Sequence, residues 1–239
     1  MIEIKNLTKR YKNITAVNCV NLNIEEGKIF TFLGENGSGK STLISMICGL
    51  TSITDGEIKI FGEKVYKGAE SVKKYVSVVP QQTSVCLNLN VRQNLEFICE
   101  IYGYGKELKK QKVQKIMEEL TLTEYEKTPA KKLSGGCLKR LSIGMSVISE
   151  PKILVLDEPT ANLDVRARKE LWEVIKGLKK IGTTVIYTTH YMDEAEELSD
   201  AIAVMSRGKL LFTGSVSDIK KVTEKGTLED AYLKITEGL

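Results

Sequence analysis

The chain has 239 residues, enough for one large α/β domain or for a core with an inserted subdomain, and no internal repeat divides it. Its 35 basic and 31 acidic residues leave a net charge of +4, a surplus too small and too scattered to indicate nucleic-acid binding. It contains no apolar leader core behind Met1 and no uninterrupted apolar run of about 18 residues, so we expect a soluble protein inside the cell.

The cysteines are odd in number, lie far apart and fall mostly within apolar runs; they are Cys19, Cys48, Cys86, Cys99 and Cys137. None of them has the Cys-x-x-Cys spacing of a metal site, and the number does not suit a disulfide framework. We therefore expect buried free thiols.

The first 30 residues predict an antiparallel β layer. Polar and apolar side chains alternate there, and residues 18–24 run into the turn Glu25-Glu26-Gly27. Within this segment Tyr11 follows Lys9-Arg10 at a turn. Its ring can stack on an adenine base, but from this segment alone a surface or core aromatic is the simpler interpretation.

A phosphate-binding loop comes next. The strand-like run 29–33 leads into the pattern Gly-x-x-x-x-Gly-Lys-Ser/Thr at residues 34–41, and the helix-like run 43–48 follows it. Glycines allow successive backbone N–H groups to point at phosphate oxygens, Lys40 supplies charge to the β- and γ-phosphates, and the Ser41 hydroxyl can take one position on Mg²⁺. The pattern assigns nucleotide binding to Gly34, Asn36, Gly37, Ser38, Gly39, Lys40, Ser41 and Thr42.

Two further strands are predicted before the character of the chain changes. Asp55-Gly56 turns into a half-buried strand at 57–61, and a β-branched run at 75–79 ends at Pro80. Gln81 follows immediately. A glutamine at a strand exit is usually solvated, but this one is placed to reach a metal ion and the attacking water.

Residues 83–150 predict a separate helical subdomain. Asn90 is a good N-cap for a helix that breaks at Gly103–Gly105, and the lysine-rich stretch 106–120 has apolar residues at helical spacing. We interpret its lysines as a solvated face rather than a nucleic-acid surface. Later in this region Ser134, Gly135 and Gly136 form a second helix start suited to an anion, although an ordinary capped helix explains these residues alone.

Acidic residues and a histidine end the next two strands. The aliphatic run 153–156 delivers Asp157 and Glu158 at its carboxyl end, where ligands of open α/β sheets bind. Asp157 would hold Mg²⁺ through water, and Glu158 would polarise the water that attacks the γ-phosphate. The β run 184–189 ends at His190, the only histidine, which is placed to touch the γ-phosphate. The acidic residues at 193–197 suit the start of a helix through its dipole, and a hairpin at 206–209 and two short helices finish the chain.

In this order and spacing, the phosphate loop, Gln81, the sequence Leu-Ser-Gly-Gly-x at 133–137, Asp157-Glu158, Asp164 and His190 resemble the nucleotide-binding subunit of an ATP-binding cassette (ABC) transporter. The resemblance covers nearly the whole chain. Residues 89–95, 188–196 and 228–234 are similar to the ATPase subunits that pair with a separate membrane protein in multidrug and antibiotic exporters.

This resemblance implies a P-loop NTPase (RecA-like) α/β core at 1–82 and 151–239, with an antiparallel β subdomain and an inserted α-helical subdomain at 83–150. Tyr11 becomes the adenine-stacking aromatic, Gln81 the Q-loop, 133–137 the signature motif, Asp164 the D-loop acid and His190 the switch histidine. ATP and Mg²⁺ are the implied cofactors. Two subunits would hold two ATP molecules head to tail, each between the phosphate loop of one and the Ser134-Gly135-Gly136 helix end of the other.

The implied partners are a second ATP-binding subunit and an integral membrane permease, with no nucleic acid, and the implied location is the inner face of the cell membrane. A soluble ABC ATPase of repair, translation or iron–sulfur assembly is an alternative, as is a nucleotide-gated module without turnover. The single cassette, the absence of a long coiled-coil insertion and the intact Glu158 and His190 argue against both. One residue departs from the family pattern: Cys137 stands where the signature usually has glutamine, and a thiol in the first turn of a helix would be reactive if exposed.

Overall fold

The computed structural model describes residues 1–81 and 84–237 and shows an α/β fold with two sheets. The strands are β1 (Ile2–Tyr11), β2 (Ile14–Ile24), β3 (Ile29–Leu33), β4 (Asp55–Ile60), β5 (Glu63–Lys64), β6 (Val76–Val79), β7 (Ile153–Asp157), β8 (Thr184–Thr189), β9 (Ala201–Ser206) and β10 (Lys209–Gly214). The helices are α1 (Lys40–Ile47), α2 (Glu70–Tyr75), α3 (Val91–Ile101), α4 (Lys106–Glu119), α5 (Gly135–Val147), α6 (Val165–Lys180), α7 (Met192–Leu198), α8 (Val216–Thr223) and α9 (Leu228–Thr236), with short 3₁₀ turns at Thr123–Tyr125 and Ala130–Lys132.

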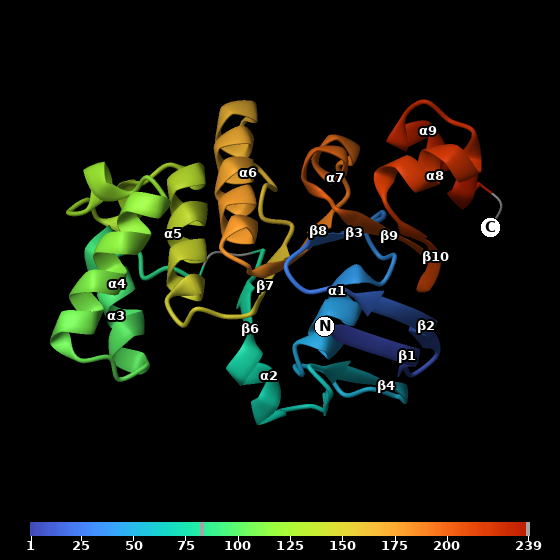
Figure 1. The fold of residues 1–239 in the computed structure, drawn as a ribbon, viewed down its shortest axis with the longest axis horizontal. Coiled ribbons are helices and arrows are strands. Elements are labelled where there is room, and N and C mark those ends of the chain that lie inside the picture. Colours follow the sequence, from blue (N-terminus) through green and yellow to red (C-terminus); the bar gives the residue numbers. More distant parts are fainter. Residues whose placement is uncertain (82–83, 238–239) are drawn as a thin grey trace.

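The larger sheet positions the chemistry. Its strand order is β10-β9-β3-β8-β7-β6, and every neighbouring pair is parallel except β9 with β10. Strands β3, β7 and β8 are buried along nearly their whole length because helices or the second sheet cover both faces, which explains their continuous apolar sequences. Since the strands are parallel, the residues that follow β3, β6, β7 and β8 meet at one edge of the sheet (Figure 1).

The smaller sheet is antiparallel, with the order β2-β1-β4-β5, which confirms the predicted β layer. Its inward side chains, among them Ile2, Ile4 and Ile58, join one hydrophobic core with α1 and one face of the parallel sheet. In Figure 1 this sheet and α1 lie on one side of the parallel sheet, and α6 and α7 lie on the other. The β1–β2 hairpin also reaches the phosphate loop, because a Cβ at Gly39 would lie 2.4 Å from the Ala16 carbonyl oxygen.

The helical region α3–α5 occupies one end of the molecule (Figure 1). Asn90 caps α3 as predicted, in a reciprocal arrangement with Gln93. Gly144 lets α5 approach the other helices closely, since a Cβ there would lie 2.9 Å from Leu120 Cδ1. The hydrophobic core of this helical region is continuous with the core between α6 and the parallel sheet. The division of the chain after residues 82 and 150 stays a prediction, and the first of these boundaries lies outside the described residues.

The C-terminal helices α8 and α9 pack at the opposite end, beside α7 and β10 (Figure 1). Tyr232 of α9 is buried with Leu33, the last residue of β3, so this pair of helices supports the strand that leads into the phosphate loop. None of the helices in the described ranges combines the length and apolar character needed to cross a bilayer.

The thiols are more varied than the sequence predicts. Cys48, Cys99 and Cys137 are buried and free, as expected, but Cys19 and Cys86 are exposed. Cys19 lies on β2, one face of which is solvated, and its backbone is left-handed (φ +51°). Its position on the solvated face explains why the side chain is exposed although its neighbours in the sequence include apolar residues. Burial raises the pKa of the Cys48 thiol to about 12.

Candidate functional site

The phosphate loop connects β3 to α1, in the strand–loop–helix context that its motif requires. Two of its glycines cannot be replaced without a backbone shift. A Cβ at Gly34 would lie 2.3 Å from the Met205 carbonyl oxygen, and Gly39 combines φ of +105° with the contact to Ala16 described above. Gly37 has φ of +81°. The loop therefore curls tightly over the end of the sheet because only glycine fits.

Lys40 is the first residue of α1, and its side chain is buried. Its Nζ donates to the carbonyl oxygens of Gly34 at 2.6 Å and Glu35 at 3.0 Å. Burial lowers the pKa of this ammonium, and the nearby carboxylates of Glu158, Asp157 and Glu35 oppose the shift. The Ser38 hydroxyl beside it is buried without a hydrogen-bond partner. The loop thus presents a cation and an unpaired hydroxyl in a water-poor site, which suits an anionic ligand.

The acidic pair ends β7 as predicted, and a neighbouring threonine holds it. Thr188 of β8 donates its hydroxyl to Asp157 Oδ1 at 2.6 Å and accepts the backbone N–H of Glu158 at 2.8 Å. Glu158 has a left-handed backbone (φ +42°), which turns the chain sharply after the strand. Thr188 was not a predicted site residue. The only signal for it is its place opposite Asp157 in the parallel register, which the sequence does not reveal.

Gln81 and His190 both approach the Glu158 carboxylate. Gln81 Nε2 lies 3.5 Å from Glu158 Oε2, and His190 Nδ1 lies 3.5 Å from Glu158 Oε1. His190 Nδ1 is buried without a closer partner, and the ring lies against Tyr191 with 4.1 Å between centroids. Three strand exits therefore deliver an amide, a carboxylate and an imidazole to one place beside Lys40.

The signature helix start lies elsewhere in the chain's own fold. Ser134 caps α5 as predicted by accepting the N–H of Cys137 at 3.3 Å, and it is exposed. A Cβ at Gly136 would lie 2.9 Å from Ala167 Cβ, so this glycine allows α5 to pack against α6. Asp164 caps α6 by accepting the N–H of Ala167 at 2.9 Å. Because α5 packs beside β6, two strands separate it from the phosphate loop that follows β3.

Tyr11 lies at the end of β1 on the surface, with 45% of its area exposed. The Lys9 ammonium lies 4.8 Å from the centre of its ring. The hairpin that carries Tyr11 is the one that reaches the phosphate loop at Ala16.

A lysine that the sequence did not single out connects α5 to the Gln81 segment. Lys139 is buried and donates from Nζ to the carbonyl oxygens of Pro80 at 3.3 Å and Gln81 at 3.0 Å. Burial lowers its pKa, with Asp157 opposing the shift. Cys137, two residues earlier, is only 5% exposed and its Sγ accepts a hydrogen bond from Arg140 Nη2 at 3.2 Å. The exposure on which its expected reactivity depended is therefore absent.

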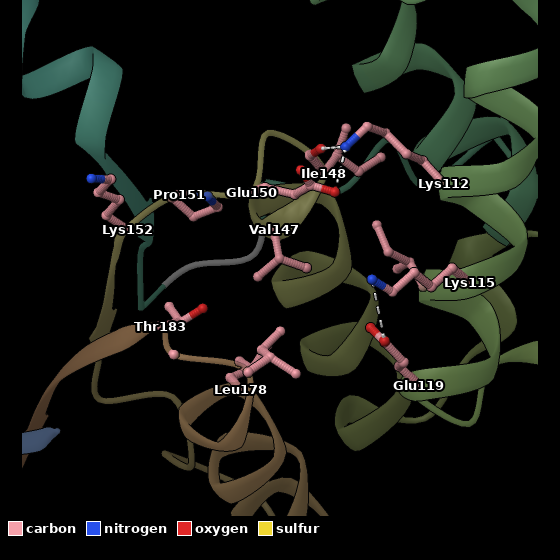
Figure 2. Close-up of a pocket in the computed structure, with 13 residues that line it drawn as sticks. Lys112, Lys115, Glu119, Val147, Ile148, Glu150, Pro151, Lys152, Leu178 and Thr183 are labelled. Carbon is pink, nitrogen blue, oxygen red and sulfur yellow. Dashed lines mark hydrogen bonds and ion pairs between the residues drawn. The ribbon is translucent and has the colours of Figure 1, made fainter. Parts of the chain in front are cut away.

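A pocket of about 350 Å³, lined by none of the phosphate-loop residues, lies between α4, the end of α5 and the turn after α6 (Figure 2). Two of the three lysines that line it pair with glutamates: Lys112 Nζ lies 2.8 Å from Glu150 Oε1 and donates to the Ile148 carbonyl at 3.2 Å, and Lys115 lies 3.8 Å from Glu119. The third, Lys152, lies over the Phe61 ring, 4.9 Å from its centre. The prediction of a simply solvated lysine face is wrong at Lys112, because this side chain ties α4 to the end of α5.

Comparison with known proteins decides the family. A family model described as ABC transporter matches residues 17–161, more than half of the chain. The chain belongs to the ABC transporter family. It is the ATP-binding component, and as a member of the ABC ATPases it binds and hydrolyses ATP.

Relatives named as ATP-binding proteins of drug-resistance transporters support this assignment. The chain is 35% identical to linearmycin resistance ATP-binding protein LnrL of Bacillus subtilis, over 92% of this chain and 70% of the relative. It is also 35% identical to the daunorubicin/doxorubicin resistance ATP-binding protein DrrA of Streptomyces peucetius, over 92% of this chain and 66% of the relative. The probable multidrug ABC transporter ATP-binding protein YbhF of Escherichia coli is likewise 35% identical, over 98% of this chain and 41% of the relative. The chain thus spans less than two thirds of two of these relatives.

Solved structures confirm the predicted fold class. A dimeric post-hydrolysis structure of the ATP-binding cassette MJ0796 with ADP and phosphate matches with a TM-score of 0.79 at 28% identity, covering 90% of this chain and 99% of that one. The subunit cbiO1 from Clostridium perfringens, part of the transporter complex cbiONQ, matches with a TM-score of 0.86 at 25% identity, covering 97% of both chains.

Proposed function

We propose that this ABC ATPase holds ATP and Mg²⁺ between two copies of the chain and uses hydrolysis to drive export through a separate membrane subunit. One observation carries the catalytic part of the proposal: Gln81 and His190 approach the same carboxylate, Glu158, at 3.5 Å each, beside the buried cation of Lys40. A base, a polar group that can position water and a cation are the parts that recur at sites where water attacks a γ-phosphate.

The phosphate loop would bind the triphosphate through its backbone N–H groups and two side chains. The Lys40 ammonium would exchange its contacts with the Gly34 and Glu35 carbonyls for phosphate oxygens, and the unpaired Ser38 hydroxyl would gain a partner. Asn36 and Gly37 are exposed at the rim of the loop, where a ligand reaches them. Gly34, Gly39 and Thr42 complete the loop, and Tyr11 would stack on the adenine.

The residues at this edge also fit Mg²⁺. The Ser41 hydroxyl, the Gln81 amide oxygen and the Asp157 carboxylate are all oxygen donors, the type that Mg²⁺ prefers. Within the described part of the chain no cluster of three or more His, Cys, Asp or Glu side chains forms a metal cage, so phosphate and water would supply the remaining positions. Bound Mg²⁺ would neutralise part of the charge on the β- and γ-phosphates.

Glu158 would act as the general base. Its carboxylate lies at the strand end, with His190 Nδ1 and Gln81 Nε2 each 3.5 Å from one of its two oxygens. Water bound between Glu158 and the γ-phosphate would lose its proton to this carboxylate as it attacks. The His190 side chain would contact the γ-phosphate and sense its loss.

The second copy would supply the other wall of the site. Ser134 and Gly135 are exposed at the start of α5, and Asp164 is exposed at the start of α6, so these residues are available to a facing subunit. In one copy the sheet order separates them from the phosphate loop. The MJ0796 cassette, which is 28% identical, forms a dimer in its post-hydrolysis structure.

The membrane subunit would dock in a groove of about 590 Å³ beside Gln81. This groove lies between the end of β6 and the helices α3 and α5, and Pro80 lines it. Ile101 is 64% exposed and Tyr102 is 50% exposed at its wall. A partner seated there would touch the segment that carries Gln81, so closure of the nucleotide site would move it. The resistance relatives favour export from the inner face of the membrane.

A complementation experiment tests the head-to-tail site. Lys40→Ala removes charge-assisted hydrogen bonds worth about 3–4 kcal/mol together, so we expect ATP affinity to fall about 100-fold or more, with Lys64→Ala as the exposed control. Ser134→Glu would keep the phosphate loop but repel ATP from the facing side. Each variant alone should lack ATPase activity, and a one-to-one mixture should recover about a quarter of the wild-type rate, because half of the dimers would contain one complete site. Normal hydrolysis by Lys40→Ala would overturn the proposal, and no recovery in the mixture would contradict the head-to-tail arrangement.

A further inference from the structure

Glu194, on α7, is a buried acid that the proposed mechanism does not use. In the sequence it is one of the acidic residues at 193–197, which favour the start of a helix through its dipole. A solvated side chain is sufficient for that role. The structure instead buries it completely, at 0% exposure, against β8. A buried carboxylate is costly unless hydrogen bonds satisfy it, so its position calls for a specific set of donors.

Two hydroxyl groups of β8 supply these donors. Glu194 Oε2 accepts a hydrogen bond from Tyr187 at 2.8 Å and another from Thr189 at 2.7 Å, and all three side chains are buried. Among the described residues, no cation forms a salt bridge with this carboxylate, and its second oxygen is buried without a hydrogen-bond partner. In the described part of the chain the carboxylate is therefore held by two side chains of β8, close to the end of the strand that His190 follows.

The bond to Thr189 fixes both sides of His190. The Thr189 hydroxyl donates a hydrogen bond to Glu194 and accepts one from the backbone N–H of Tyr191 at 3.0 Å. Since Thr189 and Tyr191 flank His190, the chain leaves the strand in a turn that Glu194 anchors. This turn places His190 Nδ1 3.5 Å from Glu158.

The bond to Tyr187 extends the same network toward the acidic strand. The Tyr187 hydroxyl lies 3.4 Å from the hydroxyl of Thr160, two residues after Glu158. One carboxylate thus connects the segments that carry His190 and Glu158, from the face of the sheet opposite Thr188.

We propose that Glu194 is a positioning residue for hydrolysis, which acts through Thr189 and the Tyr191 backbone to hold His190 toward Glu158. The inference rests on the proposed role of His190 and Glu158. A polar network that is fully buried has few alternative arrangements, so loss of its acceptor releases the turn rather than shifting it slightly. Misplacement of a group in an active site by about 1 Å costs about 100-fold in rate.

The test compares Glu194→Ala, which removes the acceptor, with Glu194→Gln, which keeps an acceptor oxygen of the same reach. We expect Glu194→Ala to lower kcat about 10- to 100-fold with the KM for ATP within about twofold of wild type, since the phosphate loop is untouched. Glu194→Gln should recover kcat to within about threefold of wild type. Glu197→Ala is the matched control, because Glu197 lies on the same helix but is exposed and pairs with Lys176.

Thr189→Val provides a second variant that removes only the hydroxyl and keeps the side-chain shape, and it decides the case if thermal melting shows that Glu194→Ala does not fold. It should show the same loss of kcat with unchanged KM. Glu194→Ala that folds and keeps kcat within twofold, or Thr189→Val that does so, would overturn the inference. If wild type hydrolyses ATP and Glu158→Gln does not, the proposed function stands whatever these variants show; if wild type does not hydrolyse ATP, the proposed function itself fails.

Discussion

Replacing the proposed general base by its amide is the most direct test of the chemistry. Glu158→Gln preserves the shape of the side chain, so the groups 3.5 Å away on Gln81 and His190 can keep their positions. The amide cannot accept the proton of the attacking water at neutral pH. General-base catalysis contributes about 10²–10⁴-fold, so we expect kcat to fall by that factor, a rise in activation free energy of about 3–5 kcal/mol.

The same substitution should strengthen ATP binding. The Glu158 carboxylate lies close enough to Lys40 to oppose the lowering of that residue's pKa by burial, so a triphosphate bound at Lys40 would also lie within the field of this carboxylate. A unit charge about 6 Å from a phosphate oxygen, at an effective dielectric constant of about 20 to 40, repels it by about 1–3 kcal/mol. Removing this charge while blocking turnover should therefore trap an ATP-bound dimer.

Two measurements check this expectation. Phosphate release at saturating ATP gives kcat, and size-exclusion chromatography with light scattering gives the oligomeric state with and without ATP. Glu173→Gln is the control, because this glutamate lies on α6, is exposed and pairs with Lys176. Hydrolysis by Glu158→Gln at the wild-type rate would refute the role of this carboxylate, and a variant that stays monomeric at saturating ATP would refute the electrostatic argument.

Two further predictions concern the surface. Tyr102→Asp should leave basal ATPase activity unchanged and weaken association with membranes that contain the permease, because it places a charge in the apolar groove. Tyr66→Asp, at an exposed tyrosine outside the groove, should bind normally, and unchanged binding of Tyr102→Asp would contradict the docking site. A maleimide reagent should label the exposed Cys19 and Cys86 rapidly and Cys137 slowly, as peptide mass spectrometry can measure; labelling of Cys137 at the rate of Cys19 would show that its contact with Arg140 does not protect it.

Local sequence features predicted most elements of this protein. Alternation predicted the antiparallel sheet, continuous aliphatic runs predicted the buried parallel strands, and Asn90 and Ser134 marked helix starts that the structure confirms. These features succeed because periodicity and capping depend on residues within a few positions of each other. The positions of Asp157, Glu158 and His190 at strand ends were equally readable, and parallel strands bring their carboxyl ends to one edge.

The partners of individual side chains could not be read in this way. Glu194, Lys139 and Lys112 each look like a solvated charge in the sequence, yet the structure buries or ties each of them. Cys137 is covered by Arg140 one turn later, and Thr188 meets Asp157 only through the parallel register.

The sequence by itself therefore determined the elements, the phosphate loop and the residues that end each strand. Only the tertiary structure decided which charges lie inside and what holds them. The physical reason is that the burial of a side chain depends on which face of a neighbouring strand it packs against. Partners such as Thr189 with Glu194, 5 positions apart, and Lys139 with Pro80, 59 positions apart, form their hydrogen bonds only when the sheet is assembled.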